Sequence, residues 1–449
     1  MTIYSPAYRG LTAGVLTTVV LVAFEALAVT TVMNVTARDL EGLALYAWSF
    51  SGFFAASLVG MIVSGEVSDS RGPRLPFLAG VGGFAVGLVV AGTAPSMPLL
   101  VAGRVLQGLG AGMLIVALYV IVVKLYPEEL RPAAFGVMAM GWVVPSLVGP
   151  AVAGWVADAW TWRAVFLAVP VLVVPAVLVM LPRLAQADPD VTAPLPRAGR
   201  KRRAVAVAAG VVVLQYAGEH LGWGSLVAVA VAVGLLAPSL PRLLPAGTLR
   251  LRRGLPTVIA QRGLLMGALL GAEAFIPLML VTERGLSPAL AGTTLTGGAL
   301  AWAGASWLQG RLSAEERRWL LIRTGGALLG VGIGIVSLAL VHAVSPLVAV
   351  AGWTVAGFGL GLSIASISVL AFRLSPETDR GAVSAAIQLS DALGSVVFVA
   401  LAGVLYSSLR TEPGHDGPAF AAVFAVMGVL AVATGVSAGR IRTRSHAES

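Results

Sequence analysis

The stretch GLGAGMLIVALYVIVVKLYPEELR, residues 108–131, recurs later in the chain as GFGLGLSIASISVLAFRLSPETDR, residues 357–380. The two stretches align without gaps, and both place glycine at three alternate positions before a Pro-Glu pair and an arginine. Close packing of membrane helices explains glycines in general, but it does not explain the matched polar ending. The sequence therefore predicts an internal repeat, in which a glycine-rich helix and the loop after it occur twice.

The composition around the repeat is that of a membrane protein. Hydrophobic residues make up 57% of the 449 residues and charged residues only 11%, whereas soluble domains carry about 25% charged residues. Apolar runs of about 17 to 25 residues recur along the chain, and each is long enough to cross a hydrocarbon core of about 30 Å as a helix. We therefore predict an all-α polytopic membrane protein that is surrounded by lipid bilayer and has no separate soluble domain.

The same composition disfavours several classes of function. The net charge of +9 does not indicate nucleic-acid binding, because the cations lie in short loops between spans. With no cysteine and only four histidines, the sequence predicts no metal site, and it contains no Walker-type loop for ATP. No serine, histidine and acid are grouped at one depth, so we predict a protein that is not an enzyme and needs no cofactor.

Fourteen membrane-spanning helices are predicted, in the order six, two and six. Residues 1–181 form the first six-helix bundle and residues 257–449 form the second. Between them, residues 182–256 form a linker with two shorter spans at about 204–221 and 225–242, for which a re-entrant hairpin is the alternative. The bundle spans are predicted at residues 10–33, 45–64, 75–92, 98–124, 133–157, 163–181, 257–281, 288–309, 319–341, 346–372, 382–406 and 418–440.

Loop charges set the predicted orientation, since Lys and Arg prefer the cytoplasmic loops of bacterial membrane proteins. When both termini are placed inside, the outer loops hold only Arg38, Arg163, Arg284 and Arg410 among the cations. This pattern needs an even number of spans, which 12 satisfies as well as 14. An even number also separates the two repeat copies, so the halves run the same way through the membrane. We expect a monomer in the bacterial cytoplasmic membrane, with both termini in the cytoplasm.

Further motifs accompany the repeat. GEVSDSRGPR at residues 65–74 lies between the second and third spans, RVLQG at 104–108 lies in the fourth, PSLVGP at 145–150 lies in the fifth, and WRAVF at 162–166 opens the sixth. In this order the motifs resemble those of the major facilitator superfamily, and within it the 14-helix drug:proton antiporters. The resemblance implies the major facilitator fold, with two six-helix bundles in parallel pseudo-repeat and a two-helix middle insertion.

The resemblance also assigns a role to the stretch GEVSDSRGPR as a cytoplasmic latch. In this fold its acid meets the start of the fifth helix of the second half, here near Gly381. Gly65 and Gly72 are expected to permit a tight turn, and the arginines are expected to hold it on the cytoplasmic side. A solvated loop that only fixes the topology is the alternative. The latch residues are Gly65, Asp69, Arg71, Gly72 and Arg74.

Small residues recur at every fourth position of the fifth span and so share one face of the helix. We expect this face to approach the opposite half closely. The resemblance to exporters further implies that the face seals the cavity and limits proton leak. The predicted exporter motif comprises Gly141, Pro145, Gly149, Pro150 and Gly154, and Ala153 continues the spacing.

An acid and a base inside the first bundle are predicted to couple transport to protons. Glu25 lies in the first span, and Arg104 and Gln107 share a face of the fourth because they are three residues apart. A charge within the bilayer costs at least a few kcal/mol unless it faces a cavity or a partner. Burial and a nearby cation shift a carboxyl pKa in opposite directions, so a Glu25 close to Arg104 can be tuned to exchange protons. A permanent structural ion pair is the alternative.

Glu273 in the second bundle occupies almost the repeat-equivalent position of Glu25, and Trp353 takes the place that corresponds to Arg104. Pro277, four residues after Glu273, lacks the N–H that would bond the Glu273 carbonyl oxygen. A free carbonyl and a carboxyl therefore coincide at one level. We predict a functional site at this break, with simple helix bending as the alternative.

A polar stripe is predicted on the penultimate span, where spacings of four, three and four place four residues on one face. The first bundle has no such stripe, so we interpret it as the wall of a water- or substrate-facing cavity, with small-residue packing as the alternative. Trp142 and Trp353 either line that cavity or pack in the core. The predicted cavity residues are Gln107, Trp142, Trp353, Ser384, Gln388 and Ser395, and the proton-coupling residues are Glu25, Arg104, Glu273 and Asp391.

These features together predict a proton-coupled secondary active transporter that exports hydrophobic or amphipathic small molecules, including drugs, by alternating access. Its energy source is the proton gradient. Proton-linked uptake or lipid export on the same fold is the alternative. The two-half repeat disfavours a channel, and the acids within the spans disfavour a membrane protein without transport activity.

Overall fold

The computed structural model of the protein describes residues 2–184, 199–219, 223–311, 318–375, 380–410 and 416–441. These residues form helices and short connections, and no strand occurs among them. The predicted all-α fold is confirmed. The helices of the first half are α1 (Arg9–Asp39), α2 (Tyr46–Arg71), α3 (Arg74–Gly92), α4 (Met97–Leu125), α5 (Arg131–Ala159) and α6 (Trp162–Leu184). They are followed by α7 (Arg200–Glu219), α8 (Trp223–Leu243), α9 (Leu255–Glu273), α10 (Ile276–Thr282), α11 (Pro288–Arg311), α12 (Arg318–Ser337), α13 (Leu347–Arg373), α14 (Arg380–Leu409) and α15 (Gly417–Ser437).

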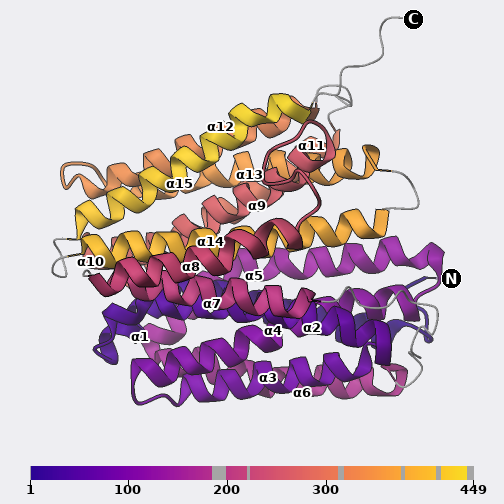
Figure 1. Ribbon diagram of the computed structural model, residues 1–449. Coiled ribbons are helices and arrows are strands. Elements are labelled where there is room, and N and C mark those ends of the chain that lie inside the picture. Colours follow the sequence, from indigo (N-terminus) through magenta and orange to yellow (C-terminus); the bar gives the residue numbers. More distant parts are fainter. Residues whose placement is uncertain are drawn as a thin grey trace, which may run out of the picture. The chain divides into compact units, whose positions relative to one another are not determined.

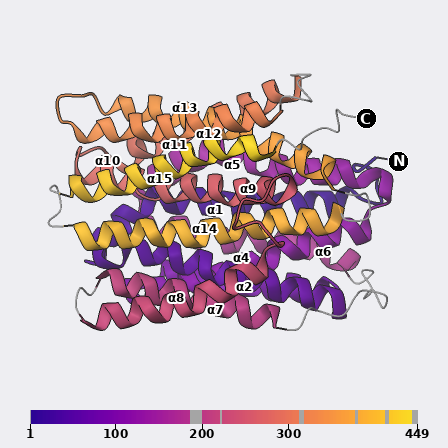
Figure 2. The same ribbon diagram turned by 45° about the horizontal axis from the view of Figure 1, so that its top comes forward.

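The chain divides into two compact units. The N-terminal unit comprises Met1–Ala208 and the short stretch Pro288–Gly292, and the C-terminal unit comprises Ala209–Ser287 and Thr293–Ser449. Within each unit the helices lie alongside one another (Figures 1 and 2). The predicted division at residues 181 and 257 stays a prediction.

The helices form and end for identifiable chemical reasons. An apolar segment in a bilayer can satisfy its backbone hydrogen bonds only within itself, which favours a helix. Proline follows the first residue of α4, α9 and α15, where its missing N–H costs nothing. Glycine in the left-handed region separates consecutive elements, with φ of 77° at Gly72 and 85° at Gly254. The turn at Gly72 allows α3 to follow α2 directly, and Gly254 ends the connecting segment that precedes α9.

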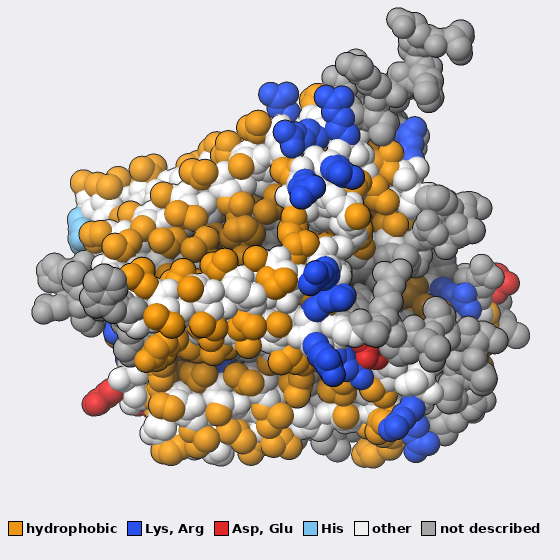
Figure 3. Space-filling model, in the orientation of Figure 1, with side chains coloured by type: hydrophobic (Ala, Val, Ile, Leu, Met, Phe, Trp, Pro, Cys, Tyr) orange, Lys and Arg blue, Asp and Glu red, His pale blue; other side chains and the backbone are white. Residues whose placement is uncertain are grey.

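Among the described residues, eleven helical segments are long and apolar enough to cross a membrane. The segment Leu255–Thr282 counts as one span although it contains both α9 and α10. A helix occupies each of the predicted span ranges, but α5, α7 and α11 are not among the eleven, and α7 begins with four consecutive cations at residues 200–203. Figure 3 shows hydrophobic side chains over much of the visible face. The chain is a multi-pass membrane protein, and the count of fourteen full spans stays a prediction.

The glycines of the first repeat copy bring α4 against two neighbouring helices. A methyl group at Gly108 would collide with the backbone of Phe53, and one at Gly112 with the backbone of Ser57, both in α2. A methyl group at Gly110 would collide with the backbone of α3. Only glycine permits backbones to approach this closely, so α4 packs directly between α2 and α3.

The second repeat copy makes the same contacts inside the C-terminal unit. Methyl groups at Gly357 and Gly361 would collide with the backbones of Gly298 and Trp302, both in α11. A methyl group at Gly359 would collide with the backbone of α12. The contacted residues of α11 are four apart, as are those of α2. The internal repeat is therefore present in the helix packing as well as in the sequence.

Candidate functional site

Glu25 and Arg104 form a buried ion pair between α1 and α4. Nη1 of Arg104 donates hydrogen bonds to Oε1 of Glu25 at 2.5 Å and to Oε1 of Gln107 at 2.7 Å. None of the three residues is more than 2% exposed. The structure thus brings together the acid, the base and the amide that the sequence placed on two separate spans.

Helix α2 also holds the guanidinium of Arg104. Its Nε donates to the carbonyl oxygen of Ser49 at 3.2 Å, and its Cζ lies 4.3 Å from the centre of the Phe53 ring. A cation over an aromatic face is attracted by the ring quadrupole. Arg104 therefore has two partners in α2 that do not depend on the charge of Glu25.

Two polar atoms of this cluster have no hydrogen-bond partner among the described residues. They are Oε2 of Glu25 and Nε2 of Gln107, and both are buried. Buried polar atoms are normally paired, so these two atoms are the points at which the cluster can take up a proton or bind a polar group.

Glu273 lies at the end of α9 in the C-terminal unit. The helix stops at Glu273, and α10 begins at Ile276, so the predicted break before Pro277 is present. The side chain of Glu273 is 9% exposed and has no hydrogen-bond partner in the described part of the chain. Trp353 is buried, and its indole fills the space beside Gly298 of α11, which is the core-packing alternative.

Asp391 has a partner that the sequence analysis missed. Nε of Arg262 in α9 lies 2.7 Å from Oδ1 and 2.8 Å from Oδ2 of Asp391 in α14. The two helices approach closely here, because a methyl group at Gly394 would collide with the backbone of Gly263. Arg262 lies inside a predicted span, where a cation is as costly as an acid, and that position was the available signal.

The rest of the predicted polar stripe is only partly described. Gln388 is half-buried, and Ser395 is buried with its hydroxyl donating to the Asp391 carbonyl oxygen at 2.7 Å. Ser395 therefore needs no ligand to satisfy its donor. The side chain of Ser384 lies outside the described residues. The cavity role of this stripe stays a prediction.

The small-residue face of α5 packs against α1. The open side of Gly141 faces Val19, and that of Gly149 faces Phe24. These two contacts lie within the N-terminal unit, and the expected approach of this face to the opposite half stays a prediction. Pro145 and Pro150 are buried, and Trp142 is 42% exposed. Gly154 lies against Ala289, in the stretch 288–292 that belongs to the N-terminal unit.

The predicted latch stretch is mostly helical. α2 continues through Arg71, and the chain turns only at Gly72. The expectation that Gly65 forms part of the turn is wrong, because charged residues do not end a helix, whereas glycine at positive φ does. Asp69, Arg71 and Arg74 are exposed.

Glu66, beside the latch residues, forms an ion pair that the sequence did not predict. Its Oε2 lies 2.9 Å from Nζ of Lys201 in the first turn of α7. The basic cluster after the linker is thereby joined to the end of α2 within the N-terminal unit. The side chains around Gly381, the expected partner of Asp69, lie outside the described residues, so the latch stays a prediction.

Comparison with known proteins identifies the family. Residues 14–344 and 272–449 match the Major Facilitator Superfamily. An uncharacterized MFS-type transporter of Mycobacterium tuberculosis (strain ATCC 25618 / H37Rv) is 26% identical over 374 residues, which cover 80% of this chain and 54% of that protein. The probable actinorhodin transporter of Streptomyces coelicolor is 27% identical over 412 residues, with 84% and 70% covered. Multidrug transporter protein MdtP of Bacillus subtilis is 23% identical over 409 residues, with 86% and 73% covered.

The chain spans about half the length of the mycobacterial relative, 54%. Among solved structures, the peptide transporter POT in complex with sulfate is similar with a TM-score of 0.69 and 17% identity, covering 96% of this chain and 94% of that one. A POT family transporter in complex with a thioalcohol conjugated peptide has a TM-score of 0.70 and 14% identity, with 95% and 94% covered. These likenesses confirm the predicted major facilitator fold. The chain belongs to the Major Facilitator Superfamily, whose members are membrane transporters and not enzymes.

Proposed function

We propose that the protein is a proton-coupled secondary transporter of the 14-helix drug:proton antiporter type, which exports hydrophobic or amphipathic small molecules by alternating access. The names of two relatives, a multidrug transporter and a probable actinorhodin transporter, support export of such compounds. The proton gradient supplies the energy, and no cofactor takes part. The protein acts as a monomer in the bacterial cytoplasmic membrane, with both termini in the cytoplasm.

The observation that carries this proposal is the buried cluster of Glu25, Arg104 and Gln107. When Glu25 is ionised, its charge compensates that of Arg104 across 2.5 Å. A proton that arrives at the unpaired Oε2 removes this compensation, while Arg104 keeps the Ser49 carbonyl and the Phe53 ring. The two protonation states therefore differ in how strongly α1 is held to α4. A ligand shifts a conformational equilibrium only through such a difference between states.

Antiport additionally requires that proton and substrate favour different states of the cluster. Nε2 of Gln107 is buried without a partner beside the same guanidinium, so it offers a donor to a polar group of the substrate. A proton on Oε2 of Glu25 neutralises the carboxylate that would otherwise attract a cationic substrate such as ethidium, so proton and substrate compete for the same acid. One small cluster thus links the two ligands.

The proposal is tested with the purified chain in sealed vesicles that hold a pH-sensitive dye. With an acidic lumen, external ethidium should accumulate inside while the lumen pH rises. Accumulation only with an acidic exterior would indicate proton-linked uptake instead. Proton flux without ethidium would indicate a channel, and movement of a fluorescent phospholipid in place of ethidium would indicate lipid export. Vesicles without the protein and vesicles with a collapsed gradient are the controls.

A further inference from the structure

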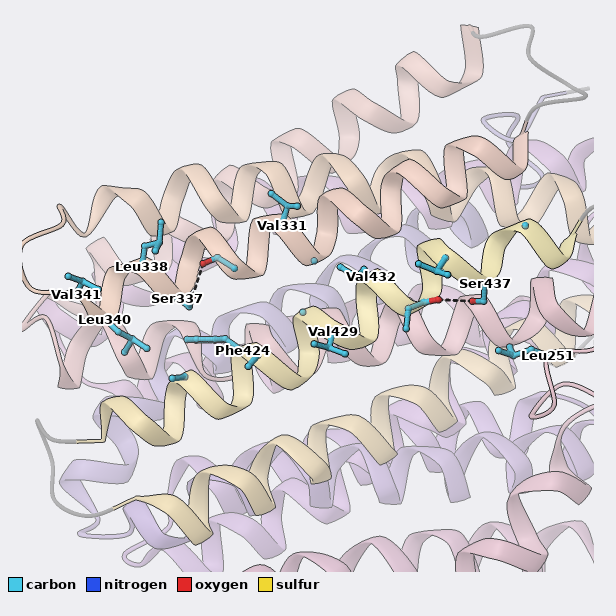
Figure 4. A pocket seen from close by; sticks show the side chains of 18 of the residues that line it. Leu251, Val331, Ser337, Leu338, Leu340, Val341, Phe424, Val429, Val432 and Ser437 are labelled. Atoms are coloured by element: carbon cyan, nitrogen blue, oxygen red, sulfur yellow. Dashed lines mark hydrogen bonds between the residues drawn. The ribbon is translucent and has the colours of Figure 1, made fainter.

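A long groove lies on the surface of the C-terminal unit between α12 and α15 (Figure 4). Its volume is about 1260 Å³. It follows α15 from Ala421 to Ser437, which corresponds to about 24 Å at the helical rise per residue. In Figure 4, Leu251 lies near Ser437 at one end, and Leu338 and Val341 lie at the other. The groove is therefore longer than one leaflet of a bilayer is thick, about 15 Å.

Glycine on α12 creates this groove. Gly330 lies so close to α15 that a methyl group there would collide with the side chain of Val432. One turn later, a methyl group at Gly334 would meet no atom within 4 Å, so the space beside it is open. The exposed side chains of Val331 and Val429 stand along the rims. α12 and α15 therefore touch at Gly330 and are separated by the apolar groove at Gly334.

The chemistry of the groove is apolar along its length and cationic at one end. Of the residues that line it, Arg440 alone is charged. Two serines line it as well, but their hydroxyls already donate to backbone carbonyls, Ser337 to Gly334 at 2.6 Å and Ser437 to Ala433 at 2.9 Å. A ligand that fits this lining carries a long hydrocarbon chain and one anionic group.

More cations surround the end at which Arg440 lies. The backbone N–H of Gly254 donates to the Arg440 carbonyl oxygen at 3.1 Å, which joins the segment before α9 to the end of α15. This segment exposes Arg250, Arg252 and Arg253. Neither they nor Arg440 form an ion pair among the described residues. Figure 3 shows Lys and Arg side chains gathered where α15 ends.

The segment before α9 is held in a strained conformation that places an apolar side chain in the groove. Leu251 has a φ of 48°, a region in which side chains other than glycine are uncommon. Its side chain lines the groove, while the arginines on both sides of it are exposed. Backbone strain of this kind persists where the surrounding structure over-determines it. The segment therefore presents an apolar contact and positive charge together.

We propose that this groove binds an anionic phospholipid, with an acyl chain between α12 and α15 and the phosphate at Arg440 and its neighbouring arginines. Each cation near an anionic membrane surface contributes about 1 kcal/mol of attraction. The predicted orientation places the end of α15 at the cytoplasmic leaflet, where anionic lipids concentrate. A second copy seated on the same groove through a two-fold axis would bring two arginine clusters together, which disfavours that occupant.

The test is native mass spectrometry of the purified full chain after equilibration with equal amounts of phosphatidylglycerol and phosphatidylcholine. We expect phosphatidylglycerol to be retained at least about fivefold more than phosphatidylcholine, the ratio that 1 kcal/mol represents. Arg440→Gln should lower this preference about fivefold. Gly334→Leu should reduce the retention of both lipids, because the new side chain would occupy the groove and its Cβ meets no atom within 4 Å.

Two matched variants serve as controls. Arg242→Gln removes an exposed arginine at the end of α8, and Gly82→Leu fills open space beside α3, so neither should change retention. Should Gly334→Leu aggregate on size-exclusion chromatography, Val429→Trp fills the groove from an exposed rim position. Equal retention of both lipids by the wild type would overturn the proposal. A dimer that Gly334→Leu abolishes would overturn it too, by assigning the groove to a second copy. The readout is lipid retention, so it is independent of the proposed export.

Discussion

At the scale of single residues, the two halves handle buried charge differently. In the N-terminal unit an acid of α1 meets an arginine of α4, as seen for Glu25 and Arg104. In the C-terminal unit an arginine of α9 meets an acid of α14, while Glu273 is without a hydrogen-bond partner among the described residues. The two halves therefore share their helix packing but differ in which helices carry the ion pairs.

Glu25→Gln keeps the side-chain shape and removes titration. We expect it to abolish gradient-driven accumulation of ethidium while sparing energy-independent counterflow, because only the driven reaction needs a proton to enter and leave. Both activities are measured side by side in the same vesicles. Glu129→Gln, at an exposed position, is the control. Normal gradient-driven transport by Glu25→Gln would show that another residue couples transport to protons.

Glu273→Gln should alter substrate affinity or selectivity by several-fold and leave proton coupling in place. The reason is that Trp353 stands at the position equivalent to Arg104 in the repeat. Glu273 therefore has no basic partner among the described residues. Counterflow at a series of substrate concentrations gives the affinity, and the proton-to-substrate ratio gives the coupling. Loss of the ratio with unchanged affinity would reverse the roles given to the two glutamates.

Arg262 and Asp391 should stabilise the C-terminal unit as a pair. We expect Arg262→Gln and Asp391→Asn each to lower the apparent melting temperature in detergent, and the double variant to lose less than the sum, with a coupling of about 1–2 kcal/mol. The pair formed by Arg163 and Asp39 is the control, because its side chains are 35% and 50% exposed and exposed pairs contribute about 0.2–1 kcal/mol. Additive effects in the first pair would contradict the prediction.

How far the residue chemistry was predictable depends on where each charge lies. Glu25 and Arg104 stood out because both interrupt long apolar runs. Arg262 lies inside the predicted span 257–281, so its position indicates a cation that needs a partner, but the sequence does not identify that partner. Its pairing with Asp391 depends on the close approach of α9 and α14 at Gly263, which is tertiary information.

At the scale of elements, apolar runs predicted the helices well and polar stretches predicted their ends less well. The charges of the stretch 65–71 predict a loop, yet this stretch continues α2. Charged side chains at the membrane surface are compatible with a helix, whereas Gly72 and the proline after it are not. The partner of the α5 face was also unpredictable, since spacing does not reveal which neighbour a face meets.

Gly112→Ala should destabilise the protein because the added methyl group would collide with the Ser57 backbone. The expected loss is about 1–3 kcal/mol, as for other overpacked cores. Gly361→Ala should behave alike, because its methyl group would collide with the Trp302 backbone. Gly82→Ala, which meets open space, is the matched control and should be neutral or slightly stabilising. Melting temperatures in detergent check the series, and equal values for Gly112→Ala and Gly82→Ala would contradict it.

At the scale of the whole molecule, the repeat predicted two units with equivalent helix packing. The positions of the glycines indicate this packing, since two backbones can approach so closely only where a residue has no side chain. The assignment of residues 288–292 to the N-terminal unit had no sequence signal, because it depends on a contact between Gly154 and Ala289.

Asp69→Asn tests the latch, which concerns the balance between access states. We expect turnover to fall severalfold while substrate affinity changes little, because the charge at this exposed position biases an equilibrium and does not touch the substrate. Vesicle transport and ethidium binding measure the two quantities. Asp158→Asn, exposed at the other end of a helix, is the control. Parallel losses of binding and turnover would argue against a latch.

The alternating glycines of α4 and α13 also determine where the protein is stiff. Packed helices slide past one another through small adjustments of the side chains between them, and here backbone meets backbone with no such layer. The set α2, α3 and α4 should therefore move as one rigid plate, and so should α11, α12 and α13. Bending is instead expected in the helices whose backbone hydrogen bonding is interrupted by proline. Among the described helices these are α5, with Pro145 and Pro150, α6, with Pro170, Pro175 and Pro182, and α8, with Pro238 and Pro241.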